Sequence, residues 1–410
     1  MSADPTPKID ALRAYRIALV FLIVTAATGA LLRAQALWPQ AWIDYRQLVH
    51  GHSHTAFYGW VFNVVFAFAL LHWIEPEQRR RAWWLFALLQ VANVGMLLSF
   101  PWQGYGPVSI SFSTLHLIVS VIWLRQLWRS PRIIAVARLW LRLAILFFFV
   151  SAIGPLLLGP LAALDLRVHP AYQLALYWFL HFQYNGWFPL ALIAALISRE
   201  HAPPARADGR ACALVAAGVV LTYAQSTLWL TPPSIVYAVA ALGALLQLLG
   251  FSLLVHTARA PLLATLRRAP LLWLAALAFG LKCLLQLLAA TPALGHWVNH
   301  PFIALAFLHL VFLGVITIGW ISLFHAHNLS ARSMHRWFAW WLFLPAFTLS
   351  ELLIILPVLT TSLPTWIVHN TSIALFILAV VQMLTFCLLL PSREISNRNI
   401  TTQASECLKG

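Results

Sequence analysis

Residues 50–63 read HGHSHTAFYGWVFN, and they open an apolar run that continues to about Trp73. A run of this length predicts a membrane-spanning helix, in which ionisable side chains are costly and usually functional. At about 100° per residue, His50 and His54 share one face of the helix, and His52 points roughly the opposite way. We therefore expect a ligand site near this end of the span. The alternative is a set of three interfacial histidines that contact headgroup water.

Similar apolar runs recur along the whole chain, in which 61% of the 410 residues are hydrophobic and only 9% are charged. This composition is typical of a polytopic helical membrane protein, and no soluble domain fits it. We predict a single all-α domain over residues 1–410 with twelve transmembrane helices and no evident internal repeat. The predicted spans are about 14–36, 47–73, 82–100, 107–128, 139–162, 171–198, 211–230, 234–256, 270–291, 301–324, 337–360 and 366–391.

The sequence argues against a cleaved signal peptide and against sites built from cysteines. The first ten residues are too polar for a signal peptide, so the first apolar run is expected to be retained as a span. The cysteines are scattered without a CxxC pair, which argues against a disulfide framework and against a zinc or iron–sulfur site. They are Cys212, Cys283, Cys387 and Cys407.

The basic residues indicate how the chain is oriented. If the N-terminus is cytoplasmic, 22 of the 26 Lys and Arg residues fall in cytoplasmic segments, Lys282 falls inside the ninth span, and only Arg33, Arg46 and Arg167 fall outside. By the positive-inside rule, both termini are expected in the cytoplasm, with the chain in a bacterial-type inner (plasma) membrane. The net charge of +15 is thus expected to contact anionic lipid, and it does not indicate nucleic acid.

Histidines on four spans that run in the same direction lie at a common depth. They are His54, eight residues after Arg46; His116, nine after Pro107; His181, eleven after Pro170; and His309, eight after Pro301. At about 1.5 Å per residue, these positions agree to within roughly one helical turn. Imidazoles that converge from several helices predict a haem or metal site. For each histidine alone, a hydrogen bond to a backbone carbonyl is the alternative, and His72, His325 and His327 are expected to be solvated at the inner rim.

Histidines on the second, sixth and tenth of twelve spans resemble the pattern of subunit I of the haem–copper oxidase superfamily, which includes oxygen and nitric oxide reductases. His309 with Gly314 and Gly319 is similar to the low-spin haem ligand region, and His181 with Gly186-Trp187 is similar to the helix that supplies a ligand to the non-haem metal. His52-Ser53-His54 followed by Gly59-Trp60 also resembles the HxHxxxxG pattern of the NnrS-like membrane proteins, a haem and copper group linked to nitric oxide stress.

The resemblance implies a haem b held by His54 or His52 and by His309, with Arg46 and Arg167 placed to meet its propionates. It also implies a second site, for copper or another metal, at His181, His116 and His50. Two departures stand against a conventional oxygen reductase. The seventh span reads LTYAQST over residues 221–227 in place of a His-His pair, and Phe307 replaces the first histidine of the tenth-span motif.

Three functions are left open by the sequence. The first is an oxidoreductase or electron-transfer subunit acting on oxygen or nitric oxide, with a cytochrome or another electron-donor subunit as partner. The second is a non-enzymatic haem or copper protein of nitric oxide stress or metal handling. The third is a secondary transporter that uses Lys282 and Glu351, which are also expected to form a buried ion pair or part of a proton path.

Overall fold

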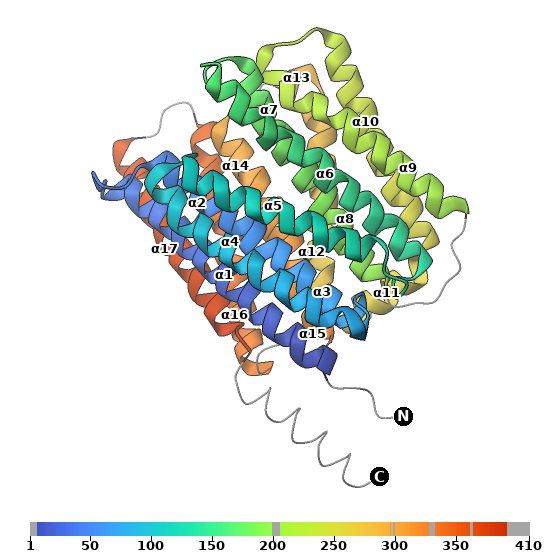
Figure 1. The fold of residues 1–410 in the computed structure, drawn as a ribbon. Coiled ribbons are helices and arrows are strands. Elements are labelled where there is room, and N and C mark those ends of the chain that lie inside the picture. Colours follow the sequence, from blue (N-terminus) through green and yellow to red (C-terminus); the bar gives the residue numbers. More distant parts are fainter. Residues whose placement is uncertain are drawn as a thin grey trace, which may run out of the picture. The chain divides into compact units, whose positions relative to one another are not determined.

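The computed structural model describes residues 6–198, 206–295, 297, 300–327, 333–360 and 364–391, which are helical throughout except for short turns and contain no strand (Figure 1). Eleven helices in this part of the chain are long and apolar enough to cross a membrane. The predicted all-α membrane class is therefore confirmed. The eleven are Lys8–Leu37, Tyr45–His72, Pro76–Gln103, Pro107–Trp128, Ala135–Ala163, Asp208–Leu230, Ser234–Thr257, Leu272–Ala289, Pro301–Ala326, His335–Leu359 and Trp366–Leu388.

The predicted count of twelve spans is not confirmed, because the sixth predicted span is not among the eleven. The segment is helical from Pro170 to Ile197, through α7 (Pro170–His181), η3 (Phe182–Trp187) and α8 (Phe188–Ile197). Its middle reads YWFLHFQYNGW over residues 177–187, and these polar and aromatic side chains lower its mean hydropathy. Most of them are buried, as residues of a site inside a helix bundle would be.

The chain divides into two compact units, Met1–Arg132 with His327–Gly410, and Ile133–Ala326. The first unit contains α1 (Thr6–Leu37), the second predicted span, α4 (Arg79–Gln103), α5 (Pro107–Trp128), α16 (Ser333–Leu359) and α17 (Thr365–Leu388). In this unit α1 packs on the second span and on α17, α16 packs on α17, and α4 packs on α5.

The second span is the core of the first unit. It is built from α2 (Tyr45–His54), η1 (Thr55–Phe62) and α3 (Asn63–His72), and every residue from Gly59 to Leu70 is buried. The α2 helix begins after Asp44, whose carboxylate accepts a hydrogen bond from the Gln47 backbone N–H at 2.9 Å. This cap fixes where the histidine-bearing helix starts.

The second unit contains α6 (Ala135–Ala163), the α7–η3–α8 helix, and α9 (Arg206–Leu221) with its continuation η4 (Thr222–Leu230). It also contains α10 (Ser234–Thr257), α11 (Arg259–Arg268), α12 (Leu272–Ala289) and α13 (Pro292–Gly295). Its last span is α14 (Pro301–His309), η6 (Leu310–Thr317) and α15 (Ile318–Ala326). Here α6 packs along the α7–η3–α8 helix, α9 along α10, and α12 against η6.

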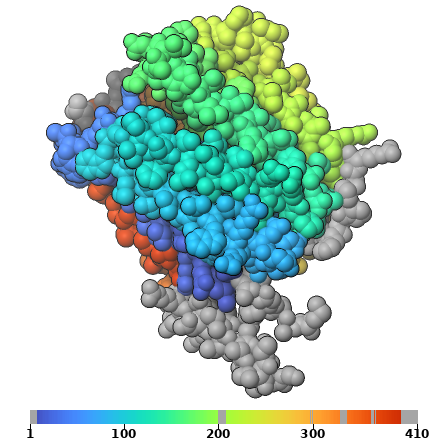
Figure 2. Space-filling model, viewed as in Figure 1, coloured from blue at the N-terminus to red at the C-terminus, as the bar shows by residue number. Residues whose placement is uncertain are grey.

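Several helices expose large apolar side chains. On α4 and α5, which cover part of the face in Figure 2, the exposed residues include Trp84, Leu88, Val91, Leu98 and Ile118. Exposed apolar surface of this extent suits contact with lipid chains. The bilayer contact expected from the composition is consistent with these surfaces.

Candidate functional site

Three of the predicted ligand histidines have the same local structure. His54, His181 and His309 are each the last residue of an α-helical segment, and each is followed directly by a π-helical segment, η1, η3 or η6. Such π-helical turns are rare, and they occur frequently at functional sites. In each case a glycine follows five residues after the histidine, at Gly59, Gly186 and Gly314, and five residues is the hydrogen-bond period of a π-helix. The chain therefore carries a repeat that the sequence analysis missed.

Two of these glycines are required by close packing against the preceding span. A Cβ atom on Gly59 would lie 2.5 Å from the Phe21 ring on α1, and one on Gly186 would lie 2.5 Å from Cβ of Phe147 on α6. The preceding helix thus approaches the π segment closely in each unit. The approach places a buried phenylalanine beside the backbone just after the histidine.

His54 and His52 are each held through the Nδ1 atom. Nδ1 of His54 lies 2.9 Å from the His50 carbonyl oxygen, and its ring stacks on Phe100 with a centroid distance of 4.0 Å. Nδ1 of His52 lies 3.0 Å from the Thr25 carbonyl oxygen and 3.1 Å from Oγ1 of Thr28. When Nδ1–H donates to a carbonyl, the lone pair is on Nε2, which is the arrangement that metal-ligating histidines commonly adopt.

His116 lies in the same unit, beside the second span. Its ring packs on Tyr58 at 4.3 Å and on Phe62 at 5.0 Å, and its Nδ1 atom lies 3.2 Å from the Ser120 hydroxyl. The side chain is only 1% exposed, and among the described residues its Nε2 atom has no hydrogen-bond partner. An imidazole nitrogen buried in this way is unusual, because an unsatisfied buried polar group costs about 1–3 kcal/mol.

His50, the third histidine of the second-span cluster, packs on the Tyr105 ring with a centroid distance of 4.7 Å.

His181 does not fit the predicted role of metal ligand in this conformation. Its Nε2 atom lies 2.8 Å from the Val219 carbonyl oxygen, and its Nδ1 atom lies 3.1 Å from Nδ2 of Asn185. Both ring nitrogens are thus engaged, with Nε2–H as donor and Nδ1 as acceptor. His181 belongs to the second unit, whereas His116 and His50 belong to the first.

His309 ends α14 and is partly exposed. It belongs to the second unit and His54 to the first, so their pairing on one iron stays a prediction. Arg46 and Arg167, the predicted propionate partners, are both exposed. Arg33 is half-buried and close enough to Glu351 and Tyr45 to interact with them electrostatically.

Lys282 and Glu351 also lie in different units, so the predicted ion pair stays a prediction. Nζ of Lys282 lies 3.4 Å from Oε1 of Gln247 on α10. Glu351 accepts a hydrogen bond from the Ser350 hydroxyl at 3.2 Å, and Gln382 on α17 donates to that hydroxyl at 3.1 Å. Neither glutamine could be assigned this role from the sequence, because buried glutamines in apolar runs have no distinguishing pattern.

At the end of the second span, two histidines that were expected to be solvated contact each other. The Nε2 atoms of His72 and His327 are 2.6 Å apart, and Phe68 packs beside both rings. Two nitrogens at this distance share one proton, with one ring as donor and the other as acceptor. Both side chains are also partly exposed, so this contact adds to the expected solvation of the two residues.

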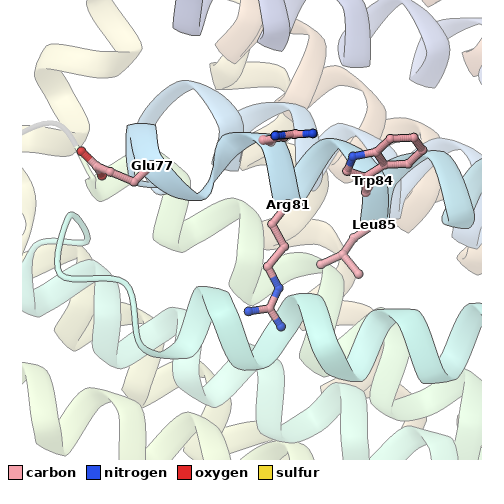
Figure 3. A pocket seen from close by; sticks show the side chains of 5 residues that line it. Glu77, Arg81, Trp84 and Leu85 are labelled. Carbon is pink, nitrogen blue, oxygen red and sulfur yellow. The ribbon is translucent and has the colours of Figure 1, made fainter.

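A basic surface pocket of about 480 Å³ lies at the start of α4 (Figure 3). It is lined by Arg80 and Arg81, by Trp84, which is 67% exposed, and by Glu77 and Leu85. Guanidinium groups next to an exposed tryptophan are typical of a membrane–water interface. The pocket suits the phosphate of an anionic lipid headgroup.

Within the described part of the chain, no group of three or more His, Cys, Asp or Glu side chains is arranged to hold a metal ion. No family model and no curated protein sequence matches the chain.

Proposed function

We propose that the protein is an integral membrane haem protein in which His54 and His309 are iron ligands. The observation that carries the proposal is the repeated placement of a histidine immediately before a π-helical segment, with a glycine five residues later. Because π-helical turns are rare and occur frequently at functional sites, the turns after His54 and His309 favour a ligand role for these two residues, whereas His181, which precedes the third turn, uses both ring nitrogens within the protein.

The residues around His54 support this role. The His50 carbonyl holds the proton at Nδ1, and Phe100 stacks on the ring, so both the tautomer and the ring plane are set before a ligand binds. Thr25 and Thr28 fix His52 in the same way, which makes His52 the alternative ligand from this span. The predicted copper site is not part of the proposal, because His181 uses both ring nitrogens.

The chemistry that a six-coordinate haem would supply is the transfer of one electron, since it has no open position for a gas. The proposed activity is therefore electron transfer, with a partner protein as donor. A direct role in oxygen or nitric oxide chemistry would need a second site. A non-enzymatic haem protein of nitrosative stress is the second candidate, and His116 favours it, because an imidazole nitrogen without a partner lies near His54.

The visible spectrum of the purified, reduced protein tests the proposal. We expect sharp Soret and α bands that His54→Ala and His309→Ala each remove or shift, and that His256→Ala, a change at an exposed histidine of α10, leaves intact. A band that moves when carbon monoxide is added would favour gas binding over electron transfer. A colourless protein, or full haem content in both ligand variants, would refute the proposal. Secondary transport would then be the better-supported function.

A further inference from the structure

Lys282 is a buried cation in the middle of α12. Its side chain is 1% exposed, and an ammonium group carries three N–H donors. Among the described residues its one hydrogen-bond acceptor is Oε1 of Gln247, at 3.4 Å. The Phe279 ring lies 5.7 Å from Nζ and adds a weak attraction to the positive charge. A single long hydrogen bond leaves most of the ammonium unsatisfied, which is costly for a buried charge.

No carboxylate of the described residues in this unit pairs with Lys282. The acidic residues between positions 133 and 326 are Asp165, Glu200 and Asp208. Asp165 lies exposed in the turn after α6, Asp208 lies in the first turn of α9, and Glu200 is outside the described residues. A charged Lys282 therefore needs a counter-charge from outside these residues.

The neighbours of Lys282 include buried amides and hydroxyls, the Cys283 thiol and the His181 imidazole, and none of these groups is a carboxylate. Nε2 of Gln247 donates to Oγ1 of Thr222 at 2.8 Å, which turns its oxygen towards Lys282. Gln286 lies one turn further along α12, and its Nε2 atom donates to Oδ1 of Asn185 at 3.1 Å. These groups can solvate a charge, but they cannot neutralise it.

From this arrangement we infer that the second unit contains a binding site for a small monovalent inorganic anion at Nζ of Lys282, beside Gln247 and Thr222. One negative charge balances the single ammonium. A phosphate or a dicarboxylate would bring a second charge into a membrane-buried site, where it would again lack a partner. The inference does not depend on haem, so it can fail or hold independently of the proposed function.

Thermal unfolding of the full-length protein in lipid nanodiscs tests the site, with tryptophan fluorescence as the readout. At constant ionic strength, replacing gluconate by bromide should raise the Tm of the wild type saturably, by roughly 2–5 °C. Lys282→Met should abolish this response and unfold no earlier than the wild type in gluconate, because it removes the unpaired charge. Lys282→Arg should keep the response, and Cys283→Ser, a change next to the lysine that leaves the ammonium intact, is the matched control.

Three outcomes would overturn the inference. The first is an equal bromide response in Lys282→Met and the wild type. The second is a wild type whose Tm does not respond to bromide; a bromide response that then appears in Glu351→Gln would point to Glu351 as the counter-ion. Chloride NMR line broadening on the wild type alone gives a direct readout that does not depend on any variant folding. Absence of that broadening would also overturn the site.

Discussion

Replacing Gly59 by alanine should destabilise the protein, although alanine is the better helix former. The new Cβ atom would lie 2.5 Å from Cδ1 and 2.7 Å from Cγ of Phe21. Carbon atoms pack at about 3.5–4.0 Å, so the ring would have to retreat by roughly 1 Å. Phe21 is 7% exposed, so its surroundings leave little room to move. Overpacking of this kind costs about 1–3 kcal/mol.

Gly280→Ala is the matched control, because nothing lies within 4 Å of a Cβ at this exposed position of α12. There the change should stabilise the helix by up to about 1 kcal/mol. The assay is denaturant unfolding of both variants in the same detergent, followed by tryptophan fluorescence. If Gly59→Ala matched the wild type or Gly280→Ala in stability, η1 would not need a glycine for the approach of α1.

Three further predictions follow from the same contacts. Gly186→Ala should cost a similar amount in the second unit, measured in the same unfolding assay, and an unchanged midpoint would contradict it. His116→Phe should be neutral or stabilising by up to about 3 kcal/mol, because it removes an unsatisfied nitrogen; a large loss of stability would show that the nitrogen has a partner. Arg80→Gln with Arg81→Gln should reduce retention of phosphatidylglycerol in native mass spectrometry, and retention equal to the wild type would remove the lipid assignment of that pocket.

The class of fold could be predicted from the sequence because each span must satisfy its own backbone hydrogen bonds in lipid, so length and hydropathy suffice. The exception is the Pro170–Ile197 helix, where the residues that lower hydropathy around His181 and Asn185 are those that form a buried network. Polar side chains in a buried network lower the hydropathy by which a membrane span is recognised.

Details of the site were harder to predict. A π-helical turn has no composition of its own, so the turn after His54 could not be read from propensity. The spacing of His54 to Gly59, repeated twice more, was a usable signal that was overlooked. The contact between Lys282 and Gln247 could not be predicted, because it depends on how α10 and α12 are rotated about their axes. In the sequence, Gln247 differs little from any other glutamine in an apolar run.

The first unit is made of helices from both ends of the chain, and this has a consequence for the order in which the protein folds. Its first helix, α1, packs on α17, the last helix of the described chain, although the whole second unit lies between them in sequence. During synthesis α1 leaves the ribosome long before α17 exists, so this interface forms only after translation is nearly complete. A ribosome that stalls before residue 365 would therefore leave a chain whose first helix still packs on the second span but lacks α17, and quality-control proteases should recognise the uncovered face of that helix.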